Sequence, residues 1–365
     1  MPYRGRMRIV YSVQRGRRAV EKKIAEIGEF GLIDRLRRLL DLEGCQPPGL
    51  SLGIGDDAAL LQAQPGCQWA VTCDVLAEGR HYLSEYLTAF QLGKRAMAVN
   101  LSDIAAMGGQ PRYALVALGL RGSTLVGDVE NWYRGFAAAL NPWDAAIVGG
   151  NMTQVDGSQF ISITLMGEVP AGQALRRSGA SPGQAILVTG YPGQAAAGLR
   201  LLQERGQDGG LEDHPLVQAY TSPMPRVGEG RAMAGDRVVS AAIDTSDGFL
   251  GDLGNLCAAS GVGARLWAAQ LPLSPALRAA TAKWGEDPVR WFLGPSDDYE
   301  LIVTCAPEQV EAAKRRIAGV NQAPVHQVGV ITPERDCLEI EGESGLSRLL
   351  RARGWDHFTS RDKEI

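Results

Sequence analysis

The segment Leu92–Met107 constrains the fold of this chain most, because it is apolar on nearly every side of the helix it would form. It ends at a glycine pair, Gly108-Gly109. A helix without a polar face is buried, yet this one carries a carboxylate, Asp103, with Asn100 on the same face. An unpaired buried carboxylate is too costly to keep ionised, so Asp103 needs a partner.

Two kinds of partner fit Asp103. One is a structural ion pair with Lys94 or Arg95, or a position at a solvent-facing edge of the helix. The other is a metal ion, which would satisfy the carboxylate better. We therefore treat Asp103 as a candidate metal ligand.

Strand-length apolar segments alternate with helical periodicity in both halves of the chain, which predicts an α/β or α+β fold. The pattern restarts after Pro170, and 365 residues are enough for roughly two domains. We expect a basic, flexible arm over 1–26, an N-terminal domain over 27–168 and a C-terminal domain over 169–365. Residues 51–61 are expected to form a strand and a turn around Gly53–Asp57. The other expected strands are 69–75, 113–120, 145–148, 160–169, 185–189, 238–243, 299–305 and 325–331, and the expected helices are 30–40, 92–107, 129–140, 195–204, 249–259 and 307–317.

Composition excludes several classes of protein. With 37 Lys and Arg against 41 Asp and Glu, the net charge of −4 argues against nucleic acid as the main partner. No apolar run reaches the roughly 18–20 residues of a membrane span. The six cysteines and four histidines are scattered, which gives no support to a zinc or iron–sulfur site and favours a reduced, cytoplasmic protein. The basic first 26 residues are interpreted as a solvated arm, with a binding tail as the alternative.

Acidic side chains gather where the expected strands begin or end. They are Asp56 and Asp57 after Gly53-Ile54-Gly55, Asp74 with Thr72 on the same strand face, Asp244 and Asp247 around Ser246, and Asp297, Asp298 and Glu300 before a later strand. Asp247 alone fits a plain helix cap, and the last group fits a solvated turn. Together, hard oxygen ligands without His or Cys indicate several Mg²⁺ or Ca²⁺ ions, whose natural partner is a polyanionic substrate.

The glycine pair Gly149-Gly150 follows the strand at 145–148, where backbone N–H groups can approach a phosphate. No GxxxxGK[ST] motif is present, and no HRD…DFG set appears. The residues therefore predict Mg²⁺-dependent phosphoryl transfer outside the usual nucleotide-binding folds.

Nine short motifs resemble those of the thiamine-monophosphate kinase family and follow the family order. They are 28–30, 53–59, 72–74, 78–81, 98–108, 175–180, 243–248, 298–301 and 354–358. The resemblance implies an α/β (α+β) two-domain fold shared with aminoimidazole ribonucleotide synthetase, with an N-terminal domain that dimerises through its sheet. It also implies the reaction ATP + thiamine monophosphate → ADP + thiamine diphosphate.

The resemblance further implies roles for single residues. The Mg²⁺ ligands would be Asp57, Thr72, Asp74, Asp103, Asp244 and Asp247, and the acids central to catalysis Asp57, Asp74, Asp103 and Asp244. ATP would contact Gly150, Arg177 and Ser246, and thiamine monophosphate would contact His81, Asp297 and Trp355. Asn151 stands where the family usually has Asp, so it would bind nucleotide and metal without the charge.

This chemistry fits the residues, because a phosphate oxygen is already an anionic nucleophile and needs no general base. Positioning and charge neutralisation then suffice, which explains a site rich in carboxylates. A cationic thiazolium suits Asp297 and Trp355, although Trp355 also fits a packed aromatic residue and His81 a hydrogen-bonded loop histidine. Asp297 stands where the family usually has Glu. The alternatives are another ATP-using enzyme of the superfamily and a non-catalytic thiamine-phosphate or nucleotide-binding regulator.

Overall fold

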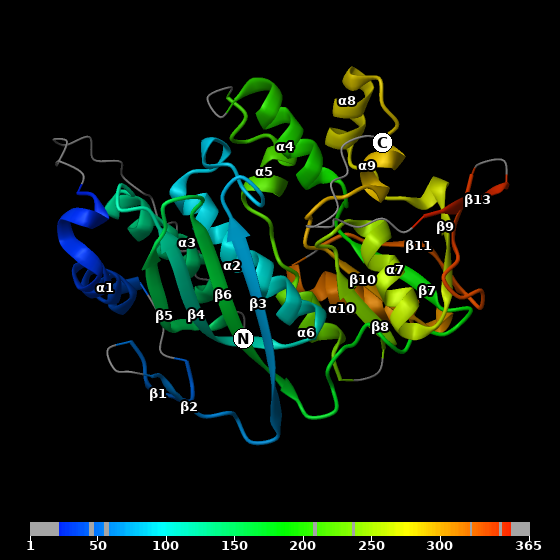
Figure 1. Cartoon of the computed structure of the whole chain (residues 1–365). Helices are drawn as coiled ribbons and strands as arrows, with labels where there is room; N and C mark the ends of the chain where they lie inside the picture. The colour runs from blue at the N-terminus through cyan, green and yellow to red at the C-terminus, as the bar shows by residue number, and fades with distance from the viewer. Residues whose placement is uncertain are drawn as a thin grey trace.

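The computed structural model describes residues 22–43, 47–54, 58–206, 210–235, 238–321, 323–342 and 345–351. Each half of the chain contains one large sheet, and the first half has a further small sheet of two antiparallel strands (Figure 1). This mixed arrangement of helices and sheets confirms the predicted α/β (α+β) class. Among the helices of the described ranges, none is long and apolar enough to cross a membrane.

The first half of the chain forms a four-stranded sheet in the order β3-β6-β4-β5. Its neighbours are antiparallel except for the parallel pair β4 and β5. Helices α2 and α3 cover one face, and α1 packs against α3 (Figure 1). The elements of this half are α1 (Ile24–Glu43), β1 (Leu50–Leu52), β2 (Leu60–Leu61), β3 (Cys67–Ala77), η1 (Ser84–Tyr86), α2 (Ala89–Ala106), β4 (Gln110–Leu120), α3 (Val126–Leu140), η2 (Asn141–Trp143), β5 (Ala146–Gln154) and β6 (Phe160–Pro170).

Strand β3 shows why two polar residues of this sheet point toward the helices. Its side chains alternate, so Thr72 and Asp74 lie on the partly buried helix-covered face. The exposed side chains between and beside them, Val71, Cys73 and Val75, lie on the other face. The alternation therefore carries two of the predicted site residues to the inside of the molecule.

The second half forms a seven-stranded sheet in the order β13-β12-β9-β11-β7-β10-β8. All neighbours are antiparallel except β12 and β9, which are parallel. The elements of this half are β7 (Ala185–Thr189), α4 (Gln194–Arg205), α5 (Pro215–Thr221), α6 (Val227–Met233), β8 (Ala241–Asp244), α7 (Phe249–Ser260), β9 (Gly263–Trp267), η3 (Ala268–Gln270), α8 (Pro275–Trp284), α9 (Pro288–Leu293), β10 (Leu301–Cys305), η4 (Pro307–Gln309), α10 (Val310–Asn321), β11 (Val325–Thr332), β12 (Leu338–Glu341) and β13 (Ser347–Leu350).

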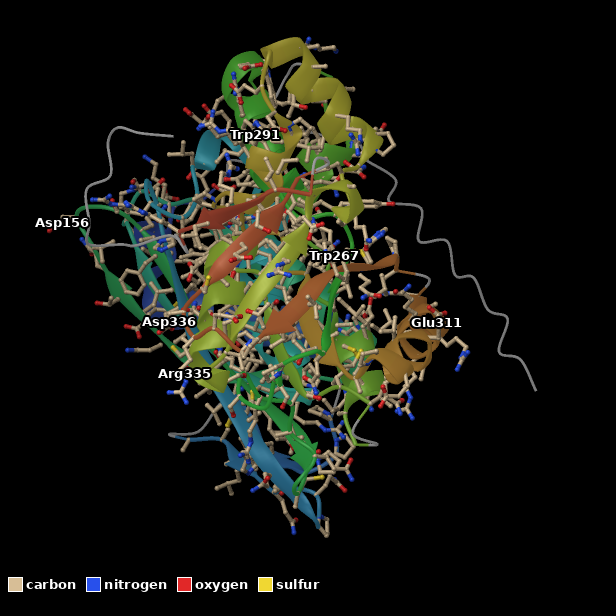
Figure 2. The ribbon with its side chains drawn as sticks, turned by 90° about the vertical axis from the view of Figure 1, so that its right-hand side faces the viewer. Asp156, Trp267, Trp291, Glu311, Arg335 and Asp336 are labelled. Carbon is tan, nitrogen blue, oxygen red and sulfur yellow. The ribbon has the colours of Figure 1, made fainter. Side chains whose placement is uncertain are left out.

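The central strands of this second sheet are buried on both faces. On β7, Leu187 belongs to the hydrophobic cluster that includes Ile317 of α10, whereas Ile186 and Val188 belong to the cluster that includes Phe249 of α7. A strand covered on both sides needs apolar residues at every position, which explains the continuous apolar run of β7. Helices α4, α5, α8 and α9 lie together at the top of Figure 1. Figure 2 shows Trp291 of α9 at that end of the molecule and Asp156, between β5 and β6, at its edge.

Candidate active site

Three acids from three separate elements meet where the two halves of the chain join. Asp74 lies on β3, Asp103 on α2, and Asp244 at the end of β8. The hydroxyl of Thr72 donates a hydrogen bond to Asp103. The hydroxyl of Ser102, also on α2, donates to Oδ2 of Asp244 at 2.7 Å. Helix α2 therefore connects the acids of both halves through two successive residues.

Burial and mutual repulsion favour the neutral form of these acids. Burial raises the pKa of Asp74 to about 7, with further increases from the charge of Asp103, a hydrogen bond to it, and the charge of Asp244. Burial, followed by the charge of Asp103, raises the pKa of Asp244 to about 7. The pKa of Asp103 is also raised by burial, although Thr72, Asp74 and the Arg177 guanidinium oppose the shift. A cation among these carboxylates would restore their charged form.

Buried acceptor oxygens without a hydrogen-bond partner in the described part of the chain support a bound cation at this site. In the described part of the chain, Oδ2 of Asp74 is buried and has no hydrogen-bond partner, and the same holds for Oδ1 of Asn100. Hard oxygen ligands of this kind suit Mg²⁺. The described residues contain no group of three His, Cys, Asp or Glu side chains arranged to hold a metal ion. They thus supply part of a ligand set, and the predicted ligand Asp57 lies outside them.

The turn after β8 is held by an acid that the sequence analysis missed. Oδ2 of Asp252 accepts hydrogen bonds from the backbone N–H groups of Ser246 and Asp247, both at 3.0 Å. Burial and the charge of Asp244 raise the pKa of Asp252 to about 8. The alternative interpretation of Asp247 as a plain helix cap was wrong, because the N-cap of α7 is Gly248, whose φ is 110°. An acid inside the largely apolar helix α7 was the available sequence signal, as it was for Asp103.

Gly150 and Asn151 lie on β5, at the sheet edge opposite β3. The pairing places Gly150 in one row with Asp74 and Asn151 in one row with Val75, so Asn151 belongs to the outer face. Three strand spacings, about 14 Å, separate these edges. A Cβ at Gly150 would lie 1.9 Å from the carbonyl oxygen of Val116, so strand packing alone requires this glycine.

Two further predicted site residues, Arg177 and His81, lie near elements that carry the three acids. Arg177 is exposed, and its charge opposes the rise in the pKa of Asp103 and Asp244. His81 follows β3, and its Nδ1 accepts a hydrogen bond at 2.9 Å from the backbone N–H of Ala77, the last residue of that strand. That contact fits the interpretation of His81 as a hydrogen-bonded loop histidine. Trp355 lies outside the described residues.

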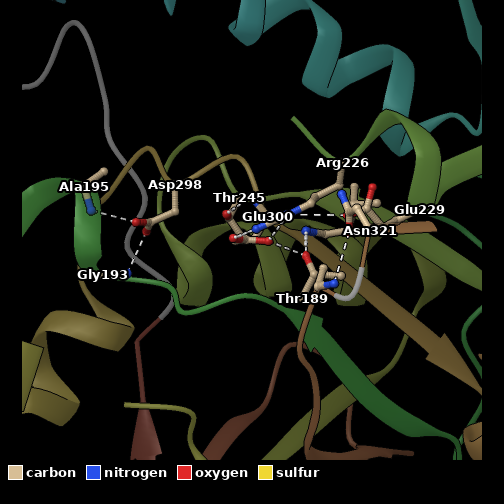
Figure 3. A network of polar contacts seen from close by, with 11 residues as sticks. Thr189, Gly193, Ala195, Arg226, Glu229, Thr245, Asp298, Glu300 and Asn321 are labelled. Atoms are coloured by element: carbon tan, nitrogen blue, oxygen red, sulfur yellow. Dashed lines mark hydrogen bonds and ion pairs between the residues drawn. The ribbon is translucent and has the colours of Figure 1, made fainter. Parts of the chain in front are cut away.

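The acids before β10 are not a solvated turn, contrary to one interpretation of the sequence. Asp298 and Glu300 are 9% and 7% exposed. Asp298 accepts from the backbone N–H groups of Gly193 and Ala195 at 2.6 and 2.8 Å, at the start of α4 (Figure 3). Glu300 forms a two-pronged ion pair with Arg226, with both N–O distances 2.6 Å (Figure 3). These two carboxylates therefore stabilise the fold by connecting the segment before β10 to the start of α4 and to Arg226.

Asp297 differs from its neighbours. It forms an ion pair with Arg95 of α2, whose side chain is 1% exposed, while the side chain of Asp297 is 34% exposed. The suggested pairing of Arg95 with Asp103 was therefore wrong, because Arg95 reaches across to the second half of the chain.

Comparisons with known proteins agree with this arrangement. Residues 55–169 match the N-terminal domain, and residues 181–338 the C-terminal domain, of AIR synthase related proteins. A thiamine-monophosphate kinase from Salmonella typhimurium is 38% identical over 343 residues, covering 91% of this chain and 99% of the relative. The chain belongs to the thiamine-monophosphate kinase family. A Bacillus subtilis thiamine-monophosphate kinase is 32% identical over 311 residues, covering 85% of this chain and 94% of the relative.

Solved structures of thiamine-monophosphate kinases share the fold. The one from Stenotrophomonas maltophilia K279a has a TM-score of 0.75 and 37% identity, and covers 87% of this chain and 98% of its own. A structure described as AaThiL complexed with AMPPCP and TMP has a TM-score of 0.71 and 29% identity, and covers 93% of this chain and 100% of its own. The family resemblance and the predicted two-domain fold are thus confirmed.

Proposed function

We propose that this chain transfers the γ-phosphoryl group of ATP directly to the phosphate of thiamine monophosphate, forming ADP and thiamine diphosphate. The observation that carries the proposal is the convergence of Asp74, Asp103 and Asp244 from both halves of a member of this kinase family. Three partly or fully buried carboxylates with raised pKa values suit a site where cations and phosphates meet. The complex of AaThiL with AMPPCP and TMP supports the same pair of substrates.

The mechanism needs positioning rather than a base. The attacking phosphate oxygen is already anionic, so the chain has to hold two polyanions in line and neutralise their charge. Thr72, Asp74, Asp103 and Asp244 would hold Mg²⁺, together with Asp57 and Asp247. When bound, Mg²⁺ would screen the repulsion between the two substrates. The exposed Arg177 is near enough to affect Asp103 and Asp244, which suits a contact with ATP phosphates.

Asn151 belongs to a separate part of the metal site. Because it lies on the outer sheet face, about 14 Å in strand spacings from β3, an ion held by Asn151 differs from an ion held by Asp74. We expect N151D to lower the Mg²⁺ concentration at half-maximal activity about 3- to 10-fold, because a carboxylate binds Mg²⁺ more tightly than an amide. T153D, two residues along the same face, is the control for added charge. Titration of Mn²⁺ binding by electron paramagnetic resonance checks the site without turnover, and equal effects of both variants would contradict the assignment.

The exposed face of the N-terminal sheet suits a homodimer. Trp69, Val71 and Val75 of β3 and Leu115 of β4 are 37%, 59%, 48% and 37% exposed. Several exposed apolar side chains on one sheet face are typical of interaction surfaces, and the family resemblance implies dimerisation through this sheet. The N-terminal half would then bind ATP and Mg²⁺ and form the dimer, while the C-terminal half completes the substrate site. The cysteines in the described ranges are unpaired, which supports placing the protein in the reducing cytoplasm.

The decisive experiment is ³¹P NMR of the purified protein with ATP, Mg²⁺ and thiamine monophosphate, with free thiamine in parallel. We expect new diphosphate resonances that require the monophosphate and do not form from thiamine. ADP without thiamine diphosphate would favour another ATP-using enzyme of the superfamily. Intact ATP would favour a binding protein without catalysis.

A further inference from the structure

Arg95 is a buried cation whose carboxylate partner lies on the other half of the chain. Its guanidinium pairs through Nη2 with Asp297 and donates through Nη1 to the carbonyl oxygen of Tyr220. The guanidinium carbon lies 4.4 Å from the centre of the Tyr220 ring and 5.9 Å from that of Tyr299. Because a buried charge is costly unless paired, Arg95 is held in one place by these contacts.

Asp297 is the one acid of its cluster with room for a ligand. Asp298 and Glu300 are buried and use their oxygens on backbone N–H groups, on a hydroxyl and on Arg226. Asp297 gives Oδ2 to Arg95, and its side chain remains 34% exposed. A carboxylate that is paired through one oxygen and remains partly exposed can bind a cation in a defined position.

Helix α2 relates this carboxylate to the site of the three acids. Arg95 and Ser102 are seven residues apart, so they lie on nearly the same helix face, about 10 Å apart along the axis. Ser102 hydrogen-bonds Asp244, and Arg95 pairs with Asp297. Tyr299 is 5% exposed and lies close enough to Asp297, Asp244 and Asp74 for all three to influence its hydroxyl. One rigid element therefore sets the spacing between the two carboxylate sites.

We propose that Arg95 is a positioning residue for the organic cation of the substrate: it fixes Asp297, and α2 thereby sets the distance from that cation to the phosphoryl-transfer site. The inference rests on the proposed function, since it takes the cation to be the charged ring of thiamine monophosphate. It predicts that Arg95 acts on recognition of the phosphate acceptor and leaves ATP binding unchanged.

The test compares R95M, R95K, D297N and the double variant R95M/D297N. We expect R95M and D297N each to raise KM for thiamine monophosphate about 10-fold, as expected for losing one charge-assisted contact, with KM for ATP changing less than about 2-fold. The KM of the double variant for thiamine monophosphate should exceed that of the more impaired single variant by less than about 2-fold, because both changes remove the same interaction. R95K should recover part of the loss. Isothermal titration of thiamine monophosphate measures binding without turnover.

The matched control is R112M, which breaks the ion pair between Arg112 and Glu168 of the N-terminal sheet, 2.8 Å between Nε and Oε2. It should change thermal stability without changing either KM. If R95M does not fold, R95K against R112K decides the question by the same KM comparison.

Several results would overturn the inference. Unchanged KM for thiamine monophosphate in R95M, equal rises in both KM values, or multiplicative losses in the double variant would each show that Arg95 does not act through Asp297. A wild-type protein that binds thiamine monophosphate without turnover would refute the proposed function alone, and the binding data would still decide the role of Arg95. A wild-type protein that neither binds nor converts it would refute both.

Discussion

Single buried acids serve two different purposes in this molecule. Asp74, Asp103 and Asp244 lie beside one another, where burial and neighbouring negative charge raise the pKa values of Asp74 and Asp244. Asp252 and Asp298 instead accept backbone N–H groups and shape the loops around the site. The first kind is suited to chemistry, and the second kind to holding that chemistry in place.

Asp252 provides a test at this scale. In D252A the N–H groups of Ser246 and Asp247 lose their acceptor, so we expect about 1–3 kcal/mol lower unfolding free energy and a higher KM for ATP. D252N keeps an oxygen acceptor, so its unfolding free energy and its KM for ATP should both change less than those of D252A. Urea unfolding and steady-state kinetics measure the effects. The control is D287A, which removes a cap contact to Val289 at α9 and should cost stability without moving KM for ATP.

Sequence patterns revealed the residues whose neighbours in the chain mark them as unusual. Asp103 was predictable because an apolar helix surrounds it, and the same reasoning would have found Asp252. The roles of Asp298 and Glu300 were not predictable, because their partners Gly193 and Arg226 lie 105 and 74 residues away. Pairings at such separations depend on the tertiary fold, which local patterns do not specify.

At the scale of the elements, long and strongly patterned segments were predicted well. The expected helix at 92–107 corresponds to α2, and the expected strand at 185–189 to β7. Helices α5 and α6, with seven residues each, were not expected, because two turns are too short to show a clear period. Other unexpected elements, which include α8, α9, β9, β12, β13 and the 3-10 helices η1, η2 and η3, have ten residues or fewer.

Strand β5 allows a test of whether Gly150 serves the fold. We expect G150A to lower the unfolding free energy by about 2 kcal/mol or more, because its Cβ would overlap the carbonyl oxygen of Val116 at 1.9 Å. G149A is the matched control, since its Cβ meets only a flexible methyl group of Leu115 at 3.0 Å. Chemical unfolding without nucleotide measures both variants. Equal stability of G150A and G149A would mean that the strand relaxes and that packing does not require Gly150.

Strand β11 carries a titratable group with a predictable pH effect. Burial and the charge of Lys314 lower the pKa of His326, with Glu300 opposing, and its ring contacts the Tyr191 ring at a tilt of 46°, with 5.5 Å between the ring centres. As the pH falls through the ordinary value of 6.5, the unfolded chain takes up the proton first, so folding stability is lost. We expect the wild type to lose more unfolding free energy between pH 7.5 and 5 than H326F, which keeps the aromatic contact.

Above pH 7.5 the His326 ring is neutral in both folded and unfolded chains. The stability curves of wild type and H326F should therefore run parallel there. Divergence in that range, or curves that stay parallel throughout the interval from pH 7.5 to 5, would contradict the assignment to His326.

For the whole molecule, the two large sheets differ in how much of their surface is exposed. The N-terminal sheet turns one face to the helices and exposes the other, whereas the central strands of the C-terminal sheet are buried on both faces. The N-terminal sheet therefore offers a broad exposed face to a second copy of the chain.

The dimer proposal is tested by V75D, which places a charge on the outer face of β3. We expect a dimer for the wild type and a monomer for V75D in size-exclusion chromatography with light scattering, because a buried unpaired carboxylate opposes association. V320D changes a residue of similar exposure on α10 and should leave the dimer intact. A monomeric wild type, or a V75D dimer, would refute the proposed interface.

The pairing of Arg95 with Asp297 also has a consequence for folding during synthesis on the ribosome. The two residues are separated by 202 positions, and a ribosome adds about 5–20 residues per second. A nascent chain therefore waits roughly 10–40 seconds between synthesising the arginine and synthesising its partner. For most of that interval α2 lacks α6 and β8, elements of the second half that pack against it, so the unfinished chain exposes apolar surface and can complete the two-half site only late in translation.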